Sequence, residues 1–283
     1  MKNMPTQLIF IAPQNARVHK TVVDQLKFQI TDVAQTSDGR ALKIISPQPR
    51  KDVREAVAVL DLPYDYLVTK RDALKPKLLI CDMDSTIIES ETLDDLAAAF
   101  GLQDKISAIT ERAMRGEIDF REALTERVAM LKDLPEQEIF DLLPGLKISA
   151  GASDLLAKAN RAGATCLLVS GGFKHVTSYV AEKLGFHHDF GNEFIIKKGK
   201  LTGEVKQPIQ DKKAKLEILN DFVEQMDITN DEVMAIGDGA NDIPMLQAAG
   251  YGIAYKAKPI VQDAVDLQIN RTDLGAAAYL FGF

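Results

Sequence analysis

The chain has 283 residues and a net charge of −7, with 46% hydrophobic and 27% charged residues, a balance typical of folded globular proteins. Its length suits two domains, and no apolar run approaches the ~18 residues that a membrane-spanning helix needs. The acidic balance argues against nucleic acid or an anionic membrane as the main partner. Two cysteines cannot form a disulfide framework. We therefore expect a cytoplasmic protein with no membrane and no nucleic-acid partner.

Residues 1–76 have the pattern of a small separate domain. Strand patterns occur at 8–12, 28–35, 41–46 and 64–69, and helical patterns at 15–26, where Asn15 could be the N-cap, and 52–60. The resulting order, β-α-β-β-α-β, resembles the ferredoxin-like fold of ACT-type regulatory domains. This segment carries a net charge of +4 and the remainder −11, and that shift supports a boundary near residue 76.

From residue 78 onward, strand and helix patterns alternate. Leu78 to Cys81 is a continuous apolar run, as expected for a strand buried on both faces. Further strands are predicted at 164–169, 233–236, 252–255 and 267–269, the last two as edge strands, and a hairpin at 194–205. Helices are predicted at 152–161, 174–184, 212–226 and 242–249. This alternation predicts an α/β doubly wound, Rossmann-like parallel sheet over residues 77–283.

The connection after the first of these strands is mostly helical. Residues 91–142 have helical patterns interrupted at Gly101, Gly116 and Pro135. A plain crossover between parallel strands needs only one helix. We therefore predict an inserted helical cap at about 90–145.

Polar residues follow three of the predicted strands. The carboxylates are Asp82 and Asp84 after the first strand, and Asp238 and Asp242 after the strand at 233–236. Ligands of open α/β sheets bind beyond the carboxyl ends of strands. Asp is also a common helix N-cap and turn residue, but four carboxylates converging on one edge favour a site for Mg²⁺, which prefers oxygen ligands.

Two further features indicate an anion site at the same edge. Ser170, Gly171 and Gly172 open a helix, where backbone N–H groups can bind phosphate. Lys215 lies on the helix before the strand at 233–236 and could reach the edge as a point cation. Taken alone, the first could be a plain N-cap and the second a solvated lysine.

Four segments of residues 78–256 together resemble the four motifs of the haloacid dehalogenase-like hydrolase superfamily: Asp82 to Thr86, Ser170 to Gly172, Lys215, and Gly237 to Asp242. Within that superfamily, several more specific segments resemble the phosphoserine phosphatases: 89–92, 114–116, 119–120, 127–128, 131–135, 170–173 and 200–203. One departure is Ala150 before Gly151, where relatives often have proline; it affects a helix entry and not the chemistry.

The resemblance implies the chemical roles of the acidic residues. Asp82 would attack phosphorus and form an aspartyl-phosphate. Asp84 would protonate the leaving oxygen and then activate water. Mg²⁺ would be held by Asp82, by the backbone carbonyl of Asp84 and by Asp238, with Asn241 and Asp242 orienting these ligands.

The resemblance also implies the substrate contacts. Ser170, Gly171 and Lys215 would bind the phosphoryl oxygens. Glu91 would pair with the substrate ammonium and Arg127 with its carboxylate. The remaining substrate-binding candidates are Asn241, beside the metal ligands, and Met114 and Phe120, which would form an apolar wall; these last two could equally be core residues of the cap.

The resulting prediction is a Mg²⁺-dependent phosphatase that hydrolyses phosphoserine in the last step of serine biosynthesis. One alternative is a phosphatase or phosphotransferase acting on another small phosphomonoester. A second is an inactive amino-acid sensor that works through residues 1–76, although the complete set of carboxylates argues against it. The oligomeric state stays open, with a homodimer as one option.

Overall fold

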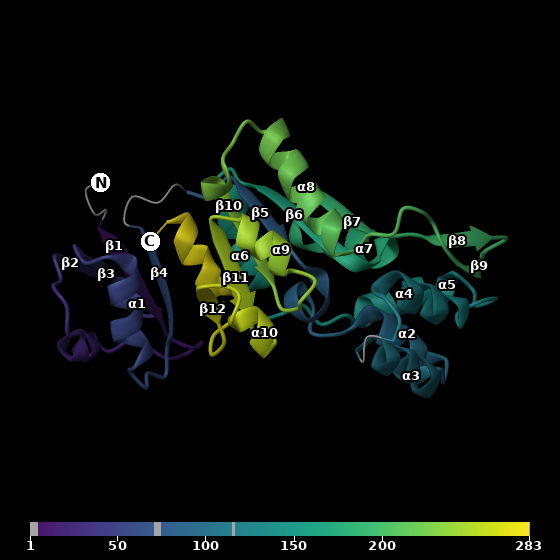
Figure 1. The fold of residues 1–283 in the computed structure, drawn as a ribbon, viewed down its shortest axis with the longest axis horizontal. Coiled ribbons are helices and arrows are strands. Elements are labelled where there is room, and N and C mark those ends of the chain that lie inside the picture. Colours follow the sequence, from purple (N-terminus) through teal and green to yellow (C-terminus); the bar gives the residue numbers. More distant parts are fainter. Residues whose placement is uncertain (1–4, 71–74, 115–116, 283) are drawn as a thin grey trace.

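The structure is a computed structural model that describes residues 5–70, 75–114 and 117–282. Figure 1 shows an elongated molecule with a small sheet at one end, a larger sheet flanked by helices in the middle, and a group of helices at the other end. The predicted fold class, a doubly wound parallel sheet with a helical cap and a small N-terminal α+β domain, is confirmed. Within the described ranges, no helix is long and apolar enough to cross a membrane.

The N-terminal part forms a four-stranded antiparallel sheet with the strand order β2-β3-β1-β4. Its elements are β1 (Thr6–Ile11), β2 (Asp32–Gln35), β3 (Ala41–Ser46), α1 (Arg50–Ala58) and β4 (Asp65–Lys70). Leu8, Phe10 and Leu42 pack against Val53 and Val57 of α1 on one face of this sheet. The boundary near residue 76 stays a prediction, with the two main sheets on either side of it.

The helix predicted at 15–26 is only a short 3₁₀ helix, Lys20–Gln25. Asn15 is not its N-cap but has a φ of 66°, in a turn closed by the bond from the Ala16 amide to the Pro13 carbonyl. The 3₁₀ segment contains consecutive β-branched residues, Thr21 to Val23, which lose χ1 freedom in a helix. Local propensity therefore does not support a long α-helix here.

The core is a six-stranded parallel sheet with the order β12-β11-β10-β5-β6-β7. Its strands are β5 (Leu78–Cys81), β6 (Thr165–Phe173), β7 (His188–Asn192), β10 (Val233–Gly237), β11 (Tyr251–Tyr255) and β12 (Leu267–Ile269). Its helices are α6 (Ala152–Arg161), α7 (Lys174–Leu184), α8 (Lys212–Gln225), α9 (Ile243–Ala248) and α10 (Pro259–Gln262).

Strand β5 shows why both faces of this sheet are covered. Leu79 and Cys81 pack in the cluster that contains the apolar residues of α6 and α7. Leu78 and Ile80 pack on the other face, in the cluster that contains residues of α8, α9 and α10. Successive side chains of a strand point to opposite faces, so a continuous apolar run belongs in a strand between two helical layers.

One expectation about the sheet edges was wrong, and one edge strand was not predicted. Strand β11 was predicted at an edge, but it lies between β10 and β12, and only β12 is the edge on that side. The opposite edge is β7, which was not predicted because its sequence, His-Asp-Phe-Gly-Asn, is polar and lacks the apolar run of the inner strands. Polar and charged side chains suit an edge strand because they discourage it from pairing with another chain.

In the described part of the insertion between β5 and β6, the cap contains four α-helices: α2 (Thr92–Ala99), α3 (Gln103–Met114), α4 (Phe120–Ala129) and α5 (Gln137–Leu142). The predicted hairpin is also present, as β8 (Phe194–Lys197) and β9 (Lys200–Val205). It does not extend the core sheet but joins the cap, where Leu201 and Val205 share a buried cluster with Leu124 and Val128 of α4. The structure therefore builds the cap from two separate segments of the chain.

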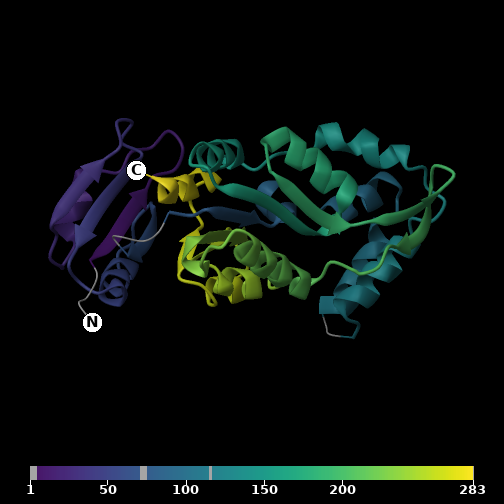
Figure 2. The same cartoon turned by 90° about the horizontal axis from the view of Figure 1, so that it is seen from above.

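The N-terminal sheet packs against the C-terminal end of the chain. Ile9, Ile11 and Leu67 share a buried cluster with Leu274 and Leu280 of the 3₁₀ helix Leu274–Phe281. Figure 2 shows that helix, in yellow, lying beside the N-terminal sheet. Polar contacts support this docking, because Arg40 Nη2 lies 2.6 Å from Asp273 Oδ2. The N-terminal part thus shares an apolar core with the rest of the protein at the end far from the cap.

Candidate active site

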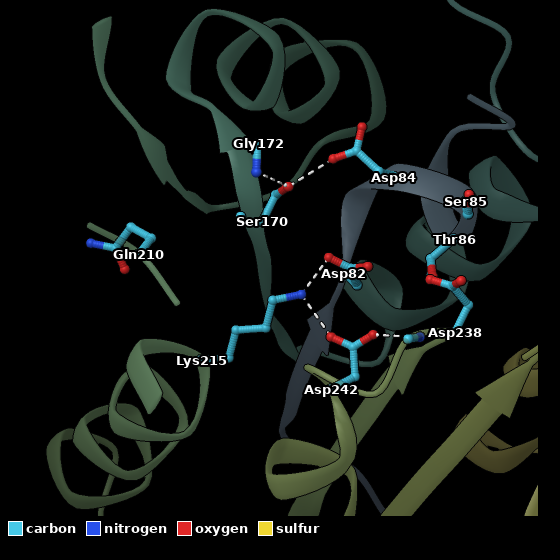
Figure 3. Close-up of polar contacts among 12 residues, drawn as sticks. Asp82, Asp84, Ser85, Thr86, Ser170, Gly172, Gln210, Lys215, Asp238 and Asp242 are labelled. Atoms are coloured by element: carbon cyan, nitrogen blue, oxygen red, sulfur yellow. Dashed lines mark hydrogen bonds and ion pairs between the residues drawn. The ribbon is translucent and has the colours of Figure 1, made fainter. Parts of the chain in front are cut away.

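The order of the strands brings the predicted site residues together. Strands β10, β5 and β6 are neighbours and run parallel, so the residues that follow them meet at one edge of the sheet. Asp82 follows β5, Asp238 follows β10, and Ser170 lies within β6 near its end. Figure 3 shows these side chains converging from the three strands, with Lys215 reaching in from α8.

Three hydrogen bonds from two residues hold the carboxylate of Asp84. The chain leaves β5 in one wide turn, Met83–Ile87, in which Ser85 has a φ of 55°. Asp84 Oδ1 accepts hydrogen bonds from the backbone amide of Thr92 at 2.9 Å and from its hydroxyl at 2.5 Å. Asp84 Oδ2 accepts one from Ser170 Oγ at 2.9 Å. These donors fix the orientation of the carboxylate between the core and the first turn of the cap helix α2.

Lys215 is a buried cation between two carboxylates. Asp211 caps α8 by accepting from the amides of Lys213 and Ala214, which places Lys215 in the first turn. Lys215 is 2% exposed, and its Nζ donates to Asp82 Oδ1 at 2.5 Å and to Asp242 Oδ1 at 2.6 Å. Burial alone would lower the pKa of Lys215, but Asp242 and Asp82 outweigh burial and raise it. The ammonium therefore stays charged.

Asp82, Asp238 and Asp242 form a compact group of carboxylates. One oxygen from each lies within 4.8 Å of the others. Asp242 is fully buried and has both oxygens engaged, by Lys215 and by the Gly239 amide at 3.0 Å. Gly237 permits this approach, because a Cβ there would stand 2.5 Å from the Asp242 carboxyl carbon. Asp238 Oδ1 accepts from the Thr86 hydroxyl at 3.4 Å.

The donor chemistry of this group fits a hard divalent cation. All of its donors are carboxylate oxygens, the ligands that Mg²⁺ prefers. Burial, and then the charge of Asp242, raises the pKa of both Asp82 and Asp238. Such shifts arise when negative charges are crowded in a poorly hydrated place, and a bound cation relieves that repulsion. Hydrogen bonds engage both oxygens of Asp242 but only one oxygen each of Asp82 and Asp238 among the contacts of the described residues, so the latter two could ligate a metal.

A pocket of about 270 Å³ lies between this edge of the sheet and the cap. Most of the predicted site residues line it: Asp82, Asp84, Glu91, Phe120, Arg127, Ser170, Gly171, Asp238 and Asn241. Lys215 and Asp242 lie beneath it, behind Asp82. Met114 was also predicted to line the pocket, but its side chain lies outside the described residues.

The cap wall of the pocket comes from α2 and α4. Helix α4 begins with a capping box, in which Asp119 and Glu122 bond each other's backbone amides. Phe120, 40% exposed, lies so close to Gly171 that a Cβ there would stand 3.1 Å from the ring. Arg127 lies further along α4, and its Nε donates to the Ala123 carbonyl at 3.3 Å. Glu91, just before α2, accepts from the Ser85 hydroxyl at 2.9 Å.

Three residues of the site received no role in the reasoning from sequence. Thr92 holds Asp84, Thr86 contacts Asp238, and Lys258 lines the pocket beside Asp238. Both threonines lie in segments that carry the resemblance, 82–86 and 89–92, but their hydrogen bonds to Asp84 and Asp238 depend on the tertiary structure. Lys258 could have been found, because it follows strand β11 and therefore lies at the same edge as the other candidates.

Comparisons with known proteins agree with this geometry. The model of the haloacid dehalogenase-like hydrolases matches residues 76–250. The chain is 42% identical, over 205 residues, to "Phosphoserine phosphatase" of Archaeoglobus fulgidus, covering 72% of this chain and 60% of that protein. It is 36% identical, over 270 residues, to "Probable phosphoserine phosphatase" of Schizosaccharomyces pombe, covering 92% of this chain and 91% of that protein.

A solved structure is also similar. It is described as "Phospho-Aspartyl Intermediate Analogue of Phosphoserine phosphatase", with 37% identity, a TM-score of 0.65, and coverage of 71% of this chain and 96% of that chain. Some curated relatives are longer, and the matches span only 60% and 50% of the length of two of them. The matched segments contain the strands and loops that carry Asp82, Ser170 and Asp238. This chain is therefore a member of the haloacid dehalogenase-like hydrolases.

Proposed function

We propose that this protein is a Mg²⁺-dependent phosphatase that hydrolyses O-phosphoserine to serine and phosphate, the last step of serine biosynthesis. The observation that carries the proposal is that catalytic carboxylates and a charged cap meet at one pocket. In the core, Lys215 bonds Asp82 and Asp242, and Thr92 and Ser170 bond Asp84. The cap adds one negative residue, Glu91, and one positive residue, Arg127, to the lining of the same pocket. The similarity to proteins named phosphoserine phosphatase supports the same reaction.

In the first step, the Asp82 oxygen that Lys215 does not hold attacks phosphorus, and the bond from phosphorus to the serine oxygen breaks. Asp84, in its protonated form, gives its proton to that leaving oxygen. Serine departs, and Asp82 carries the phosphoryl group. Lys215 keeps the attacking carboxylate in place and offsets its charge, because its ammonium lies 2.5 Å from Asp82 Oδ1.

In the second step, Asp84 takes a proton from water, and the water oxygen attacks phosphorus. The bond between phosphorus and Asp82 breaks, phosphate leaves, and both carboxylates return to their starting states. Ser170 bonds Asp84, and its own Oγ accepts from the Gly172 amide at 2.8 Å, so the acid–base group is held on a rigid strand end.

The metal would be held by Asp82, Asp238 and the backbone carbonyl of Asp84, with Asp242 fixing Lys215 and the loop behind them. When bound, Mg²⁺ supplies positive charge that offsets the charge developing on the phosphoryl oxygens. Ser170, Gly171 and Asn241 line the same pocket as Asp82, and these residues would bind those oxygens.

The charges of phosphoserine are opposite to those of the cap residues that line the pocket. Arg127 offers a planar fork for a carboxylate, and Glu91 offers a negative charge for an ammonium. Phe120 would cover the apolar side of the substrate, and we keep Met114 as a further candidate for that wall. The alternative, a phosphatase for another small phosphomonoester, needs neither charge on the cap. Cys81 and Cys166 are both free and buried, which supports work in the reducing cytoplasm.

Hydrolysis of a panel of phosphomonoesters tests the reaction and its metal. We expect turnover of phosphoserine with Mg²⁺, no turnover after EDTA, and recovery when Mg²⁺ is added back. Ca²⁺ should restore little activity, because its longer bonds and larger coordination shell displace the nucleophile. Full activity in metal-free buffer, or a clear preference for a phosphomonoester without an amino acid, would contradict the proposal.

The cap assignment predicts a substrate-selective loss for Arg127→Ala. The transition-state stabilisation calculated from its kcat/KM on phosphoserine should fall by ~2–5 kcal/mol, the typical cost of leaving a desolvated charge unpaired. The loss on phosphoethanolamine, which lacks a carboxylate, should be much smaller. Arg127→Lys should recover little activity, because lysine lacks the planar fork.

Arg112→Ala is the matched control for that variant. Arg112 is another arginine of the cap, but it pairs with Glu126 at 2.6 Å and is not among the residues that line the pocket. We expect Arg112→Ala to leave the preference between the two substrates unchanged. Equal losses on both substrates for Arg127→Ala would show that Arg127 supports the cap and does not recognise the substrate.

A further inference from the structure

Lys258 reaches the catalytic pocket from a strand that carries none of the predicted site residues. Strand β11 ends at Tyr255, and the following loop leads to Lys258, the residue before helix α10. The backbone amide of Lys258 donates to the carbonyl of Asp238 at 3.1 Å, which fixes the loop beside the carboxylate group. The Lys258 side chain is exposed, and it lines the pocket together with Asp238 and Glu91.

Lys258 is a basic residue in a pocket that is lined mainly by acidic residues. Asp82, Asp84, Glu91 and Asp238 all line it, whereas its lining contains only two basic residues, Arg127 and Lys258. Lys215 lies beneath, held by Asp82 and Asp242. Arg127 belongs to the cap, so among the lining residues Lys258 is the one basic side chain that the core contributes.

The position of Lys258 sets its ammonium against acids of both the core and the cap. Its backbone is bonded to Asp238, and its side chain lines the same pocket as Glu91. Desolvation and then Asp84 raise the pKa of Glu91, and Lys258 opposes that rise.

We propose that Lys258 is a further substrate-binding residue of this pocket, whose ammonium draws the phosphate of the substrate into an otherwise acidic site and at the same time opposes the binding of Mg²⁺ beside Asp238. The first effect follows because a dianionic phosphate is attracted to a cation at the mouth of a pocket. The second follows because Lys258 and a metal held by Asp238 would be two cations in one small pocket, and like charges repel each other. The inference rests on the proposed function, since it assumes a phosphorylated substrate and a divalent metal.

The two effects have opposite signs, and this makes them testable. In Lys258→Met, which keeps the length of the side chain but removes its charge, we expect Mg²⁺ to bind about two- to five-fold more tightly, the size of one exposed charge interaction. The KM for phosphoserine should rise about two- to five-fold. Both changes should shrink at high salt, because an exposed charge is screened.

Calorimetric titration of Mg²⁺ without substrate measures the first effect, and steady-state kinetics measures the second. Lys258→Arg keeps the charge and should resemble the unaltered protein. Lys256→Met is the matched control: Lys256 is an exposed lysine of the same loop, but its Nζ lies over the Tyr255 ring, 5.3 Å from the ring centroid, and it does not line the pocket. It should change neither quantity.

The outcomes separate this inference from the proposed function. Unchanged or weaker Mg²⁺ binding by Lys258→Met would overturn the inference while the unaltered protein still bound Mg²⁺ and hydrolysed phosphoserine. Weakening of both Mg²⁺ and substrate would indicate damage to the pocket and would also overturn it, as would equal shifts in Lys256→Met. Failure of the unaltered protein to bind Mg²⁺ would instead overturn the proposed function.

Discussion

Asp82→Asn should abolish steady-state hydrolysis of phosphoserine, with a loss of ~10⁴–10⁶-fold, the range seen when a covalent nucleophile is removed. An amide oxygen is a poor nucleophile and leaves no carboxylate to carry the phosphoryl group. Phosphate-monoester hydrolysis can require ~10²¹-fold acceleration, which a pocket without its nucleophile cannot supply. Lys215 would keep Asp242 as a partner, at 2.6 Å, so the site should not collapse.

Asp82→Glu is the matched control for this variant. It keeps a carboxylate and its charge but moves the oxygens by about one bond length. The comparison therefore shows whether activity needs only a negative charge at this position or a nucleophile at the correct distance from phosphorus. Thermal unfolding should show that both variants are folded. A folded Asp82→Asn protein that hydrolyses phosphoserine at the unaltered rate would disprove the nucleophilic role.

Asp84→Asn should lose ~10²–10⁴-fold in kcat, the usual contribution of one acid–base group. Asparagine can still accept from Thr92 through its one amide oxygen, and its amide nitrogen would donate to Ser170 Oγ, so the local structure should hold. It cannot, however, give up a proton to the leaving group and then retrieve one from water. Both the transfer of the phosphoryl group to Asp82 and its release to water should slow. Thr92→Val, which removes one donor to Asp84 and keeps the backbone donor at 2.9 Å, should lose much less.

An aryl phosphate separates the two roles of Asp84. Its leaving group needs no proton, so Asp84→Asn should still form phosphorylated Asp82 rapidly but hydrolyse it slowly. Rapid-quench measurements should then show a burst of released phenol and a phosphorylated protein that accumulates. A rate equal to that of the unaltered protein on phosphoserine would show that another group moves the proton.

Much of the core could be predicted because its signals are local. The bounds predicted for β5, α6, α7 and β12 agree with the structure. The continuous apolar run of β5 requires a strand between two helical layers, and Gly185, in the left-handed conformation, ends α7 as expected of a C-cap glycine. From the sequence alone, the carboxyl-end rule also predicts Asp82, Ser170 and Asp238 at one edge of the sheet.

Elements that depend on distant partners were missed or misplaced. Strand β7 is polar and half exposed, and it exists because β6 offers it a backbone to pair with. The 3₁₀ helix Leu274–Phe281 was not predicted, and its apolar residues are buried by α6 and by the N-terminal sheet. The β8–β9 hairpin was predicted, but its place on the cap depends on the contact of Leu201 and Val205 with α4.

The same division holds within the site. By itself, the sequence determined which residue types stand at the ends of the strands, and hence that acids, a serine and a lysine share one edge. The prediction that Ser170 to Gly172 open a helix was wrong, because these residues continue strand β6 and α7 begins at Lys174. Only the tertiary structure decided their partners: Ser170 bonds Asp84 across 86 residues of chain, and Lys215 bonds Asp82 across 133. It also placed Thr92 on Asp84 and Lys258 beside Asp238. Strand and helix patterns depend on residues that are close in the sequence, so they can be predicted from it. These contacts join segments far apart in the sequence, and nothing in the local sequence of one segment specifies its partner in the other.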